Sequence, residues 1–242
     1  MRKAQGSPSR QRGLGPAIVA LLQLSASAAG AFPPYRSTDA ETAEAGTLEL
    51  RLGLGKVERE GGDNAYASPL LRANLGLARN LEFISELEYD ADGGRLGDGA
   101  AGFKGVHVLS PSFSVGVETL ALLPVSSRLS GGGVESQILA TLRRDDLLLH
   151  VNAGGFYDPR QPETERGWRA SVLAELRRGR WRPGLELFAK QVHGERTQVQ
   201  AGPGVIVEVG PFDVRAGVHV GLTSAAPDLR ATLWMSCKWT VW

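Results

Sequence analysis

The residues that could perform chemistry fall into three groups, and the first is a glycine-rich stretch. GDGAAG at positions 97 to 102 matches the G-x-G-x-x-G pattern of dinucleotide-binding turns. Such a turn needs a strand before it and a helix after it, because the phosphates sit at the helix N-terminus. The residues that follow, FKGVHVL, have the composition of a strand. We therefore interpret these glycines as a link that enters a strand, and we expect no cofactor.

The second group is a histidine with polar neighbours. His150 and Asn152 are two residues apart, so they share one face if this segment is a strand. Barrel lipases pair a serine with a histidine and a polar orienting group. No serine adjoins this pair in sequence, and Ser136 or Ser171 could reach it only through the fold. We expect no catalytic residues, with lipid hydrolysis kept as an alternative.

The third group consists of charged and histidine side chains at alternate positions in many segments. Both signs occur, so these side chains could pair with one another across an enclosed space. Two interpretations remain open, a satisfied polar interior and a path or binding site for a solute. The candidates for such a lining are Glu49, Arg51, Arg72, Glu82, Glu86, Glu88, Lys104, Arg143, His150, Arg169, Glu175, Glu186, Lys190, Arg215 and His219.

The elements that would position these side chains are strands. In TLELRLGLGK (47 to 56), leucine occupies every second position, which is the period of a strand with one apolar face. The same period predicts twelve strands, most of them 9 to 11 residues long, which suits a tilted transmembrane strand. They cover 47–56, 69–78, 81–90, 100–109, 112–122, 134–143, 147–157, 168–177, 182–191, 198–209, 214–223 and 229–239.

The links between these strands alternate in length. Short links (79–80, 110–111, 144–146, 178–180 and 210–212) alternate with longer polar ones (57–68, 91–99, 123–133, 158–167, 193–197 and 224–228). Outer-membrane barrels have tight periplasmic turns, longer outer loops and an even number of strands. Most aromatic residues also lie near predicted strand ends. The sequence therefore predicts an all-β, antiparallel up-and-down transmembrane β-barrel of about 12 strands over residues 47–242, with a soluble β-sandwich as the alternative.

The N-terminus has the pattern of an export signal. Four bases and no acid precede a short apolar stretch that ends in small residues, so we expect a signal peptide at 1–31, cleaved before Phe32. A membrane anchor is the alternative. Residues 32–46 show no clear period and would form an N-terminal segment that leads into the first strand. The expected location is the outer membrane, with lipid and the barrel-assembly machinery as partners.

Composition restricts the function further. Removing the four signal-peptide bases from the 27 Lys and Arg leaves 23, against 26 Asp and Glu, so there is no basic excess for a nucleic acid. The single Cys237 cannot form an internal disulfide, and no Cys and His cluster has zinc-ligand spacing, so no metal is expected.

Several stretches resemble a known family. YRSTDAETAEAGTLELRLGLG, RLGDGAAGFKGVHVL, LALLPVSSRLSGGG and GVHVGLTSAAPDLRATLWMSCKW are similar to segments of a family of bacterial outer-membrane β-barrels, described as transporters or as phenol-degradation meta-pathway outer-membrane proteins. The resemblance covers most of residues 35–239. It implies a location and an architecture, and it supports passage of a small molecule, with apolar or aromatic ones among the candidates.

Four features test the expected register. Pro203 should lie at a bulge or strand end, because it lacks a donor for the ladder. Ile84, Phe188 and Ile206 would point inward, which implies either an apolar patch in the lumen or a slip of one residue in the strand register.

Glycines at inward positions would widen the lumen locally, and the candidates are Gly53, Gly55, Gly76 and Gly221. The last outward aromatic residue of the final strand could be Trp239 or Trp242. Twelve strands enclose a narrow lumen, so we expect a narrow pore, or else a closed structural barrel.

Overall fold

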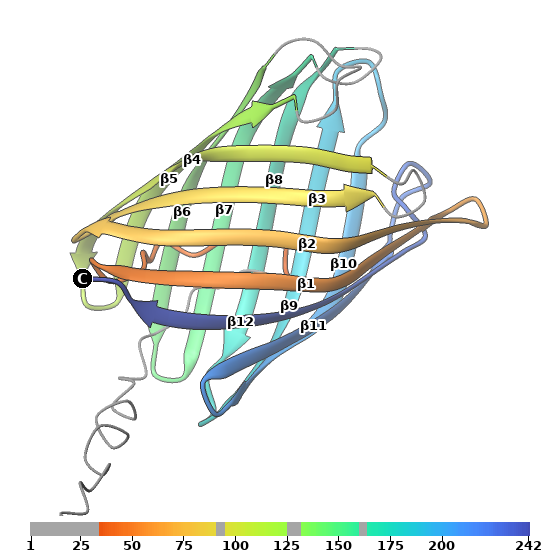
Figure 1. Cartoon of the computed structure of the whole chain (residues 1–242). Coiled ribbons are helices and arrows are strands. Elements are labelled where there is room, and N and C mark those ends of the chain that lie inside the picture. Colours follow the sequence, from red (N-terminus) through yellow and green to blue (C-terminus); the bar gives the residue numbers. More distant parts are fainter. Residues whose placement is uncertain (1–33, 91–94, 125–131, 160–163) are drawn as a thin grey trace, which may run out of the picture.

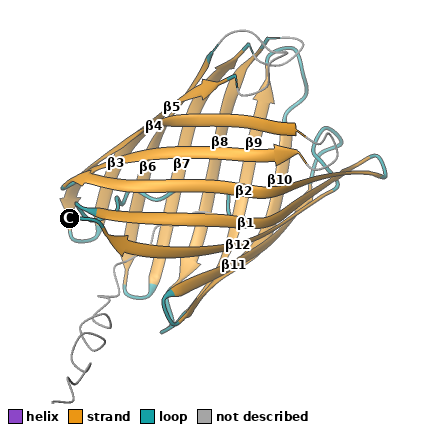
Figure 2. Cartoon of the chain, viewed as in Figure 1, coloured by secondary structure: helices purple, strands orange, loops and turns teal. Residues whose placement is uncertain are grey.

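A closed antiparallel barrel of twelve strands forms the molecule (Figure 1). The structure is a computed structural model and describes residues 34–90, 95–124, 132–159 and 164–242. Each strand pairs with its neighbours in sequence, and β1 closes the ring on β12. The strands are β1 (Thr47–Glu60), β2 (Asp63–Ala78), β3 (Leu81–Asp90), β4 (Arg95–Ser110), β5 (Phe113–Leu123), β6 (Gly133–Arg144), β7 (Leu147–Asp158), β8 (Glu165–Leu176), β9 (Trp181–Val192), β10 (Gln198–Val209), β11 (Phe212–Gly221) and β12 (Leu229–Thr240). The predicted fold class is confirmed, and Figure 2 shows strands joined by loops in the part of the chain that is described.

Alternation along each strand separates the two faces of the wall. In β2, Leu71 and Leu77 are exposed outside, whereas Arg72 and Asn74 are buried inside. The outer face is apolar on all twelve strands, with Phe103, Ile138 and Leu185 more than half exposed. Such a surface is stable only against an apolar medium or another protein. None of the described residues forms a helix long and apolar enough to cross a membrane.

Short turns gather at one end of the barrel, as the sequence predicts. Residues 79–80, 111–112, 145–146, 177–180 and 210–211 make these links. Asn80 (φ 74°) and Asp145 (φ 53°) take the left-handed conformation that asparagine and aspartate tolerate better than other side chains. The C-terminus lies at this end (Figure 1), and the Val241 N–H donates to the Gly46 carbonyl at 2.7 Å.

The predicted long link at 57–68 is wrong. β1 and β2 continue through this stretch as a hairpin that projects beyond the rest of the wall (Figure 1). Gly61 and Gly62, with φ of 58° and 95°, form the two-residue turn between them. Glycine accepts the positive φ that tight hairpin turns require. The charged residues on both sides hid this hairpin, because they gave the stretch the composition of a loop.

Pro203 also differs from its expected place. It lies within β10 rather than at a bulge or strand end. On one side it pairs with Leu185 of β9. On the other side, the ladder to β11 lacks pairs at Gly202 and Pro203 and resumes in unchanged register at Gly204. The barrel therefore tolerates the missing donor by a local interruption of one ladder.

The remaining register questions are resolved by the structure. Ile84, Phe188 and Ile206 are buried inside, so the lumen contains apolar patches and no slip has occurred. β12 ends at Thr240, Trp239 faces outward within it, and Trp242 lies two residues past its end.

Candidate functional site: the barrel lumen

All fifteen predicted lining residues lie on the inner side of the wall. Ten are buried: Glu49, Arg51, Arg72, Glu82, Lys104, His150, Glu175, Glu186, Arg215 and His219. The other five are half-buried and pair with partners inside the lumen: Glu86, Glu88, Arg143, Arg169 and Lys190. Most of these charges therefore belong to ion pairs, as a stable interior of low dielectric requires.

Several inward polar residues were missed by sequence reasoning. Four of them lie two residues away from other inward residues of the same strand, so the strand period could have identified them: Glu118, Glu135, Gln137 and Arg182. For Lys56 and Glu58, the strand period that begins at Glu49 and Arg51 predicts the outer face. A register shift between Gly53 and Gly55 reverses the parity of β1, so Lys56 and Glu58 turn inward.

The N-terminal segment, residues 34–46, lies inside the lumen. Glu186 of β9 is its first anchor. The Glu186 Oε1 oxygen accepts from the Arg36 N–H at 2.9 Å, the Ser37 N–H at 2.5 Å and the Ser37 hydroxyl at 2.6 Å. His219 Nε2 approaches the other carboxylate oxygen at 2.8 Å. Hydrogen bonds to an ionised carboxylate are stronger than hydrogen bonds between neutral groups.

Further along the segment, side chains of successive strands take the place of a strand partner. Asn152 of β7 exchanges two hydrogen bonds with the Thr38 backbone, each 2.8 Å long. The Ala40 N–H donates to Thr141 Oγ1 of β6, and the Ala40 carbonyl accepts from Ser114 Oγ of β5, both at 2.8 Å. The Ala43 N–H donates to Glu82 Oε2 of β3 at 2.6 Å, so the segment crosses the inner wall from β9 to β3 with hydrogen bonds to its backbone along the way.

Acidic side chains of the segment reach bases of the wall. Asp39 is fully buried and lies 3.4 Å from Lys104 Nζ, and Glu41 pairs with Arg143 at 2.7 Å. Burial alone would raise the pKa of Asp39, but Lys104 and other nearby bases outweigh it and lower that pKa. Asp39 is therefore held as a carboxylate in the docked segment.

Inward glycines make room for the segment. A Cβ on Gly204 would lie 2.6 Å from the Tyr35 ring, and one on Gly217 would lie 2.6 Å from Pro34. On Gly76 it would meet the Glu44 carbonyl at 2.0 Å. The segment can lie this close to the wall only because these positions lack side chains.

The glycines expected to widen the lumen do not do so. Gly76 is covered by the segment, and Gly221 is covered by Ala226 and Pro227. Leu70 lies over Gly53. Gly55 faces outward beside Tyr66 because of the parity change in β1. Neighbouring chain therefore fills the space that Gly53, Gly76 and Gly221 leave inside the lumen.

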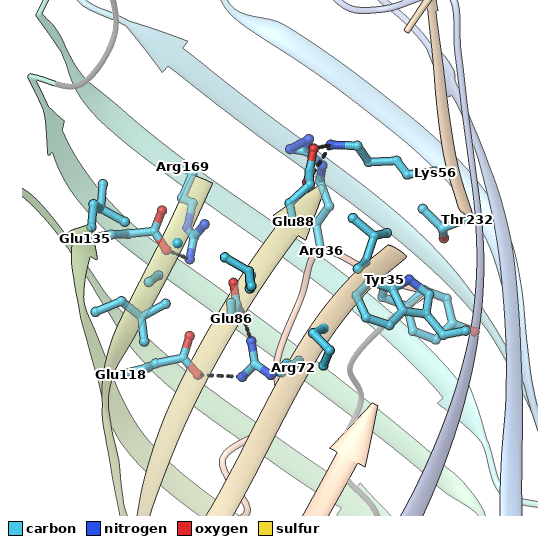
Figure 3. Close-up of a pocket in the computed structure, with 18 of the residues that line it drawn as sticks. Tyr35, Arg36, Lys56, Arg72, Glu86, Glu88, Glu118, Glu135, Arg169 and Thr232 are labelled. Atoms are coloured by element: carbon cyan, nitrogen blue, oxygen red, sulfur yellow. Dashed lines mark hydrogen bonds and ion pairs between the residues drawn. The ribbon is translucent and has the colours of Figure 1, made fainter. Parts of the chain in front are cut away.

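A cavity of about 320 Å³ remains in the lumen (Figure 3). Tyr35 and Arg36 of the segment line it together with the wall, and the Arg36 guanidinium lies 4.3 Å from the centre of the Phe188 ring. The apolar part of the lining includes Leu70, Leu120, Leu122 and Trp234. The remaining lining is mostly charged.

The histidine site does not assemble a serine nucleophile. His150 Nδ1 lies 2.9 Å from Thr141 Oγ1, which already accepts from Ala40. Ser171 donates to Asn152 at 3.2 Å, and Ser136 pairs with Thr119 on the exposed side. The glycines of 97–102 lie within β4, not before a helix. Among the described residues, no three His, Cys, Asp or Glu side chains are grouped as metal ligands would be.

Comparison with known proteins assigns the fold to the porin-like barrels of outer membranes. The NanC porin matches with a TM-score of 0.60 at 9% identity, over 78% of this chain and 98% of that porin. The KdgM porin in complex with disordered oligogalacturonate gives 0.60 at 10%, over 79% and 98%. An outer membrane channel from Pseudomonas putida F1 gives 0.60 at 11%, over 83% and 98%. No family model and no curated protein sequence matches the chain.

Proposed function

We propose that this protein is an outer-membrane pore that passes small molecules through a lumen narrowed by its own N-terminal segment. The observation that carries the proposal is the cavity of about 320 Å³ inside a closed porin-like barrel. A barrel that served only as a structural element would not need an internal space lined by accessible charges. The fold shared with porins and with an outer membrane channel supports the same function.

The apolar part of the lining supports solutes with an apolar or aromatic body. Leu70, Leu120, Leu122 and Phe188 form this part of the cavity surface. The volume is at the lower end of the range of ligand sites, about 300–1,000 Å³. A single ring with a short substituent is therefore a fitting size.

The proposed location follows from the outer face. Its apolar band fits the lipid of a membrane, and aromatic residues lie toward both ends of it: Tyr66, Tyr157 and Trp168 toward one end, and Trp181, Phe212 and Trp239 toward the other. Export by a cleaved signal peptide and insertion by the barrel-assembly machinery are part of this proposal.

The proposal is tested by conductance in planar lipid bilayers. The purified full chain should give discrete channel events, and a variant that lacks residues 34–44 should give larger ones because the segment no longer narrows the lumen. The control is the same barrel with the exposed Asn64→Ala substitution, which should conduct as the parent does. If neither the parent nor the shortened variant conducts, the closed structural barrel becomes the correct interpretation.

A further inference from the structure

The charges that line the cavity are separated by sign around the barrel. The carboxylates Glu86, Glu88, Glu118 and Glu135 come from β3, β5 and β6, which adjoin or nearly adjoin one another. The bases come from the segment and from β8, β12, β1 and β2: Arg36, Arg169, Arg230, Lys56 and Arg72. Four acids face five bases, so the lining has almost no excess of either sign. The total charge of the lining therefore does not by itself favour simple anions or simple cations, and the grouping of the charges decides the preference.

One group of these residues has more positive than negative charge. Arg36 of the segment and Arg230 of β12 both contact the Glu58 carboxylate, at 3.7 Å and 3.3 Å. Two guanidinium groups thus share one carboxylate, and we name these three residues the positive group. Burial lowers the pKa of Arg36 to about 9, and the charge of Arg230 acts in the same direction. The Arg36 and Arg230 side chains are 27% and 18% exposed, so both are open to a solute.

A second group has the opposite composition. The Arg72 guanidinium of β2 contacts both Glu86 of β3 and Glu118 of β5, the latter at 3.6 Å (Figure 3). Two carboxylates thus share one guanidinium, and we name these three residues the negative group. Glu118 is buried, whereas the Glu86 side chain is 37% exposed. Glu86 is therefore the carboxylate of this group that a solute would meet.

The other two ion pairs of the cavity balance themselves. Lys56 pairs with Glu88 at 2.9 Å, and Arg169 pairs with Glu135. They add no net charge to either side of the cavity. The apolar side chains Leu70, Leu120 and Phe188 line the same space as both groups.

From this arrangement we infer that the cavity selects small zwitterions with an apolar or aromatic body, such as amino acids with an apolar side chain. The solute's anionic group lies toward Arg36 and Arg230, and its cationic group lies toward Glu86. The inference rests on the proposed function and specifies its substrate class. A solute with one charge satisfies one group and is unfavourable at the other, whereas a zwitterion satisfies both.

Uptake into vesicles that contain the purified full chain tests the inference. The solutes are phenylalanine, the anion 3-phenylpropanoate and the cation phenethyltrimethylammonium, which share a phenyl ring and differ in charge. Arabinose reports whether the pore passes an uncharged solute at all. Solute inside the vesicles is measured by mass spectrometry after subtraction of protein-free vesicles. Phenylalanine should enter at least about five-fold faster than either singly charged solute.

Charge-neutralising variants identify the residues responsible. Glu86→Gln should shift the preference toward the anion, and Arg230→Gln should shift it toward the cation. Glu60→Gln and Arg59→Gln remove the same charges from the exposed hairpin and should leave the order of solutes unchanged. Retained heat-modifiable mobility on gels shows that each variant is folded.

The outcomes separate the two proposals. If arabinose enters but phenylalanine has no advantage, or if neither cavity variant changes the order, the zwitterion inference is overturned and the pore function stands. If no solute enters, the pore function fails, and the inference fails with it.

Discussion

Asn152 and Thr38 form a reciprocal pair: the Thr38 N–H donates to Asn152 Oδ1, and Asn152 Nδ2 donates to the Thr38 carbonyl, both at 2.8 Å. The Asn152 amide thus imitates the edge of a neighbouring strand. Both residues are buried, so neither backbone group of Thr38 has solvent as a substitute. This pair fixes the middle of the N-terminal segment to the wall.

Removal of this amide should loosen the segment. Asn152→Ala leaves the buried Thr38 N–H and carbonyl without these partners, at a cost of about 1–3 kcal/mol. The segment should leave its site roughly ten-fold more often, since about 1.4 kcal/mol corresponds to ten-fold. The measurement is the rate of maleimide labelling at Ala40→Cys in a Cys237→Ser background. Asn64→Ala on the exposed hairpin is the control, and equal rates in the two variants would contradict the prediction.

Addition of one methyl group at the wall should displace the segment more directly. In Gly204→Ala the new Cβ lies 2.6 Å from Tyr35 Cε1 and 2.9 Å from Pro34 Cγ, so the segment must move. Channel conductance in planar bilayers should rise. Gly105→Ala is the matched control, because no heavy atom lies within 4 Å of its new Cβ. A conductance that stays at the parent value in Gly204→Ala would show that the segment does not narrow the path.

The binding of the N-terminal segment inside the lumen should depend on pH through the Asp39 carboxylate. Its pKa is lowered below the ordinary value of 3.8 in the docked segment, so docking favours the carboxylate. The contribution of Asp39 is therefore complete above pH about 4 and is lost as the pH falls through the docked pKa. In bilayer recordings, parent and Asp39→Asn channels should differ at pH 7, with the variant more conducting. The difference should shrink below pH about 4, and a difference that stays constant to pH 3 would exclude this role.

Topology can be tested on intact cells. We expect the hairpin tip at Gly62 and the link at Gly132 to face outward, and the turn at Asp145 to face the periplasm. Cysteines at these positions, in a Cys237→Ser background, should be labelled by an impermeant maleimide at the first two sites and not at the third. Labelling at Asp145 but not at Gly132 would invert the proposed orientation. The expected outward links around Gly93 and Glu163 lie outside the described residues.

The wall was predictable from the sequence because its signals are local. Alternation in residues such as Leu71, Arg72 and Asn74 depends only on the strand period, and turns such as the one at Asn80 depend on a few adjacent residues. A bulge is harder to see, so the reversed parity at Lys56 went unpredicted. The Gly61-Gly62 pair is typical of a tight hairpin turn, but the charged residues on both sides of it in the sequence made the stretch resemble a loop.

The content of the lumen was not predictable, because its contacts are distant in sequence. Thr38 is bonded to a residue 114 positions away, and Ser37 to one 149 positions away. Residues 34–46 have no period of their own, since the backbone of residues 36–43 is bonded to side chains of the wall rather than to a neighbouring strand. The fifteen candidate lining residues could be chosen by parity, but their pairing required the three-dimensional arrangement of the strands.

The β1–β2 hairpin provides a position for protein engineering. Its tip at Gly61-Gly62 is exposed, no other heavy atom lies within 4 Å of a Cβ built on either glycine, and the turn is separate from the cavity lining. A foreign peptide inserted between these glycines would extend from two paired strands without contacting the barrel wall. With the tip facing outward, such an insertion would display an epitope or an affinity tag on the cell surface and leave the lumen intact.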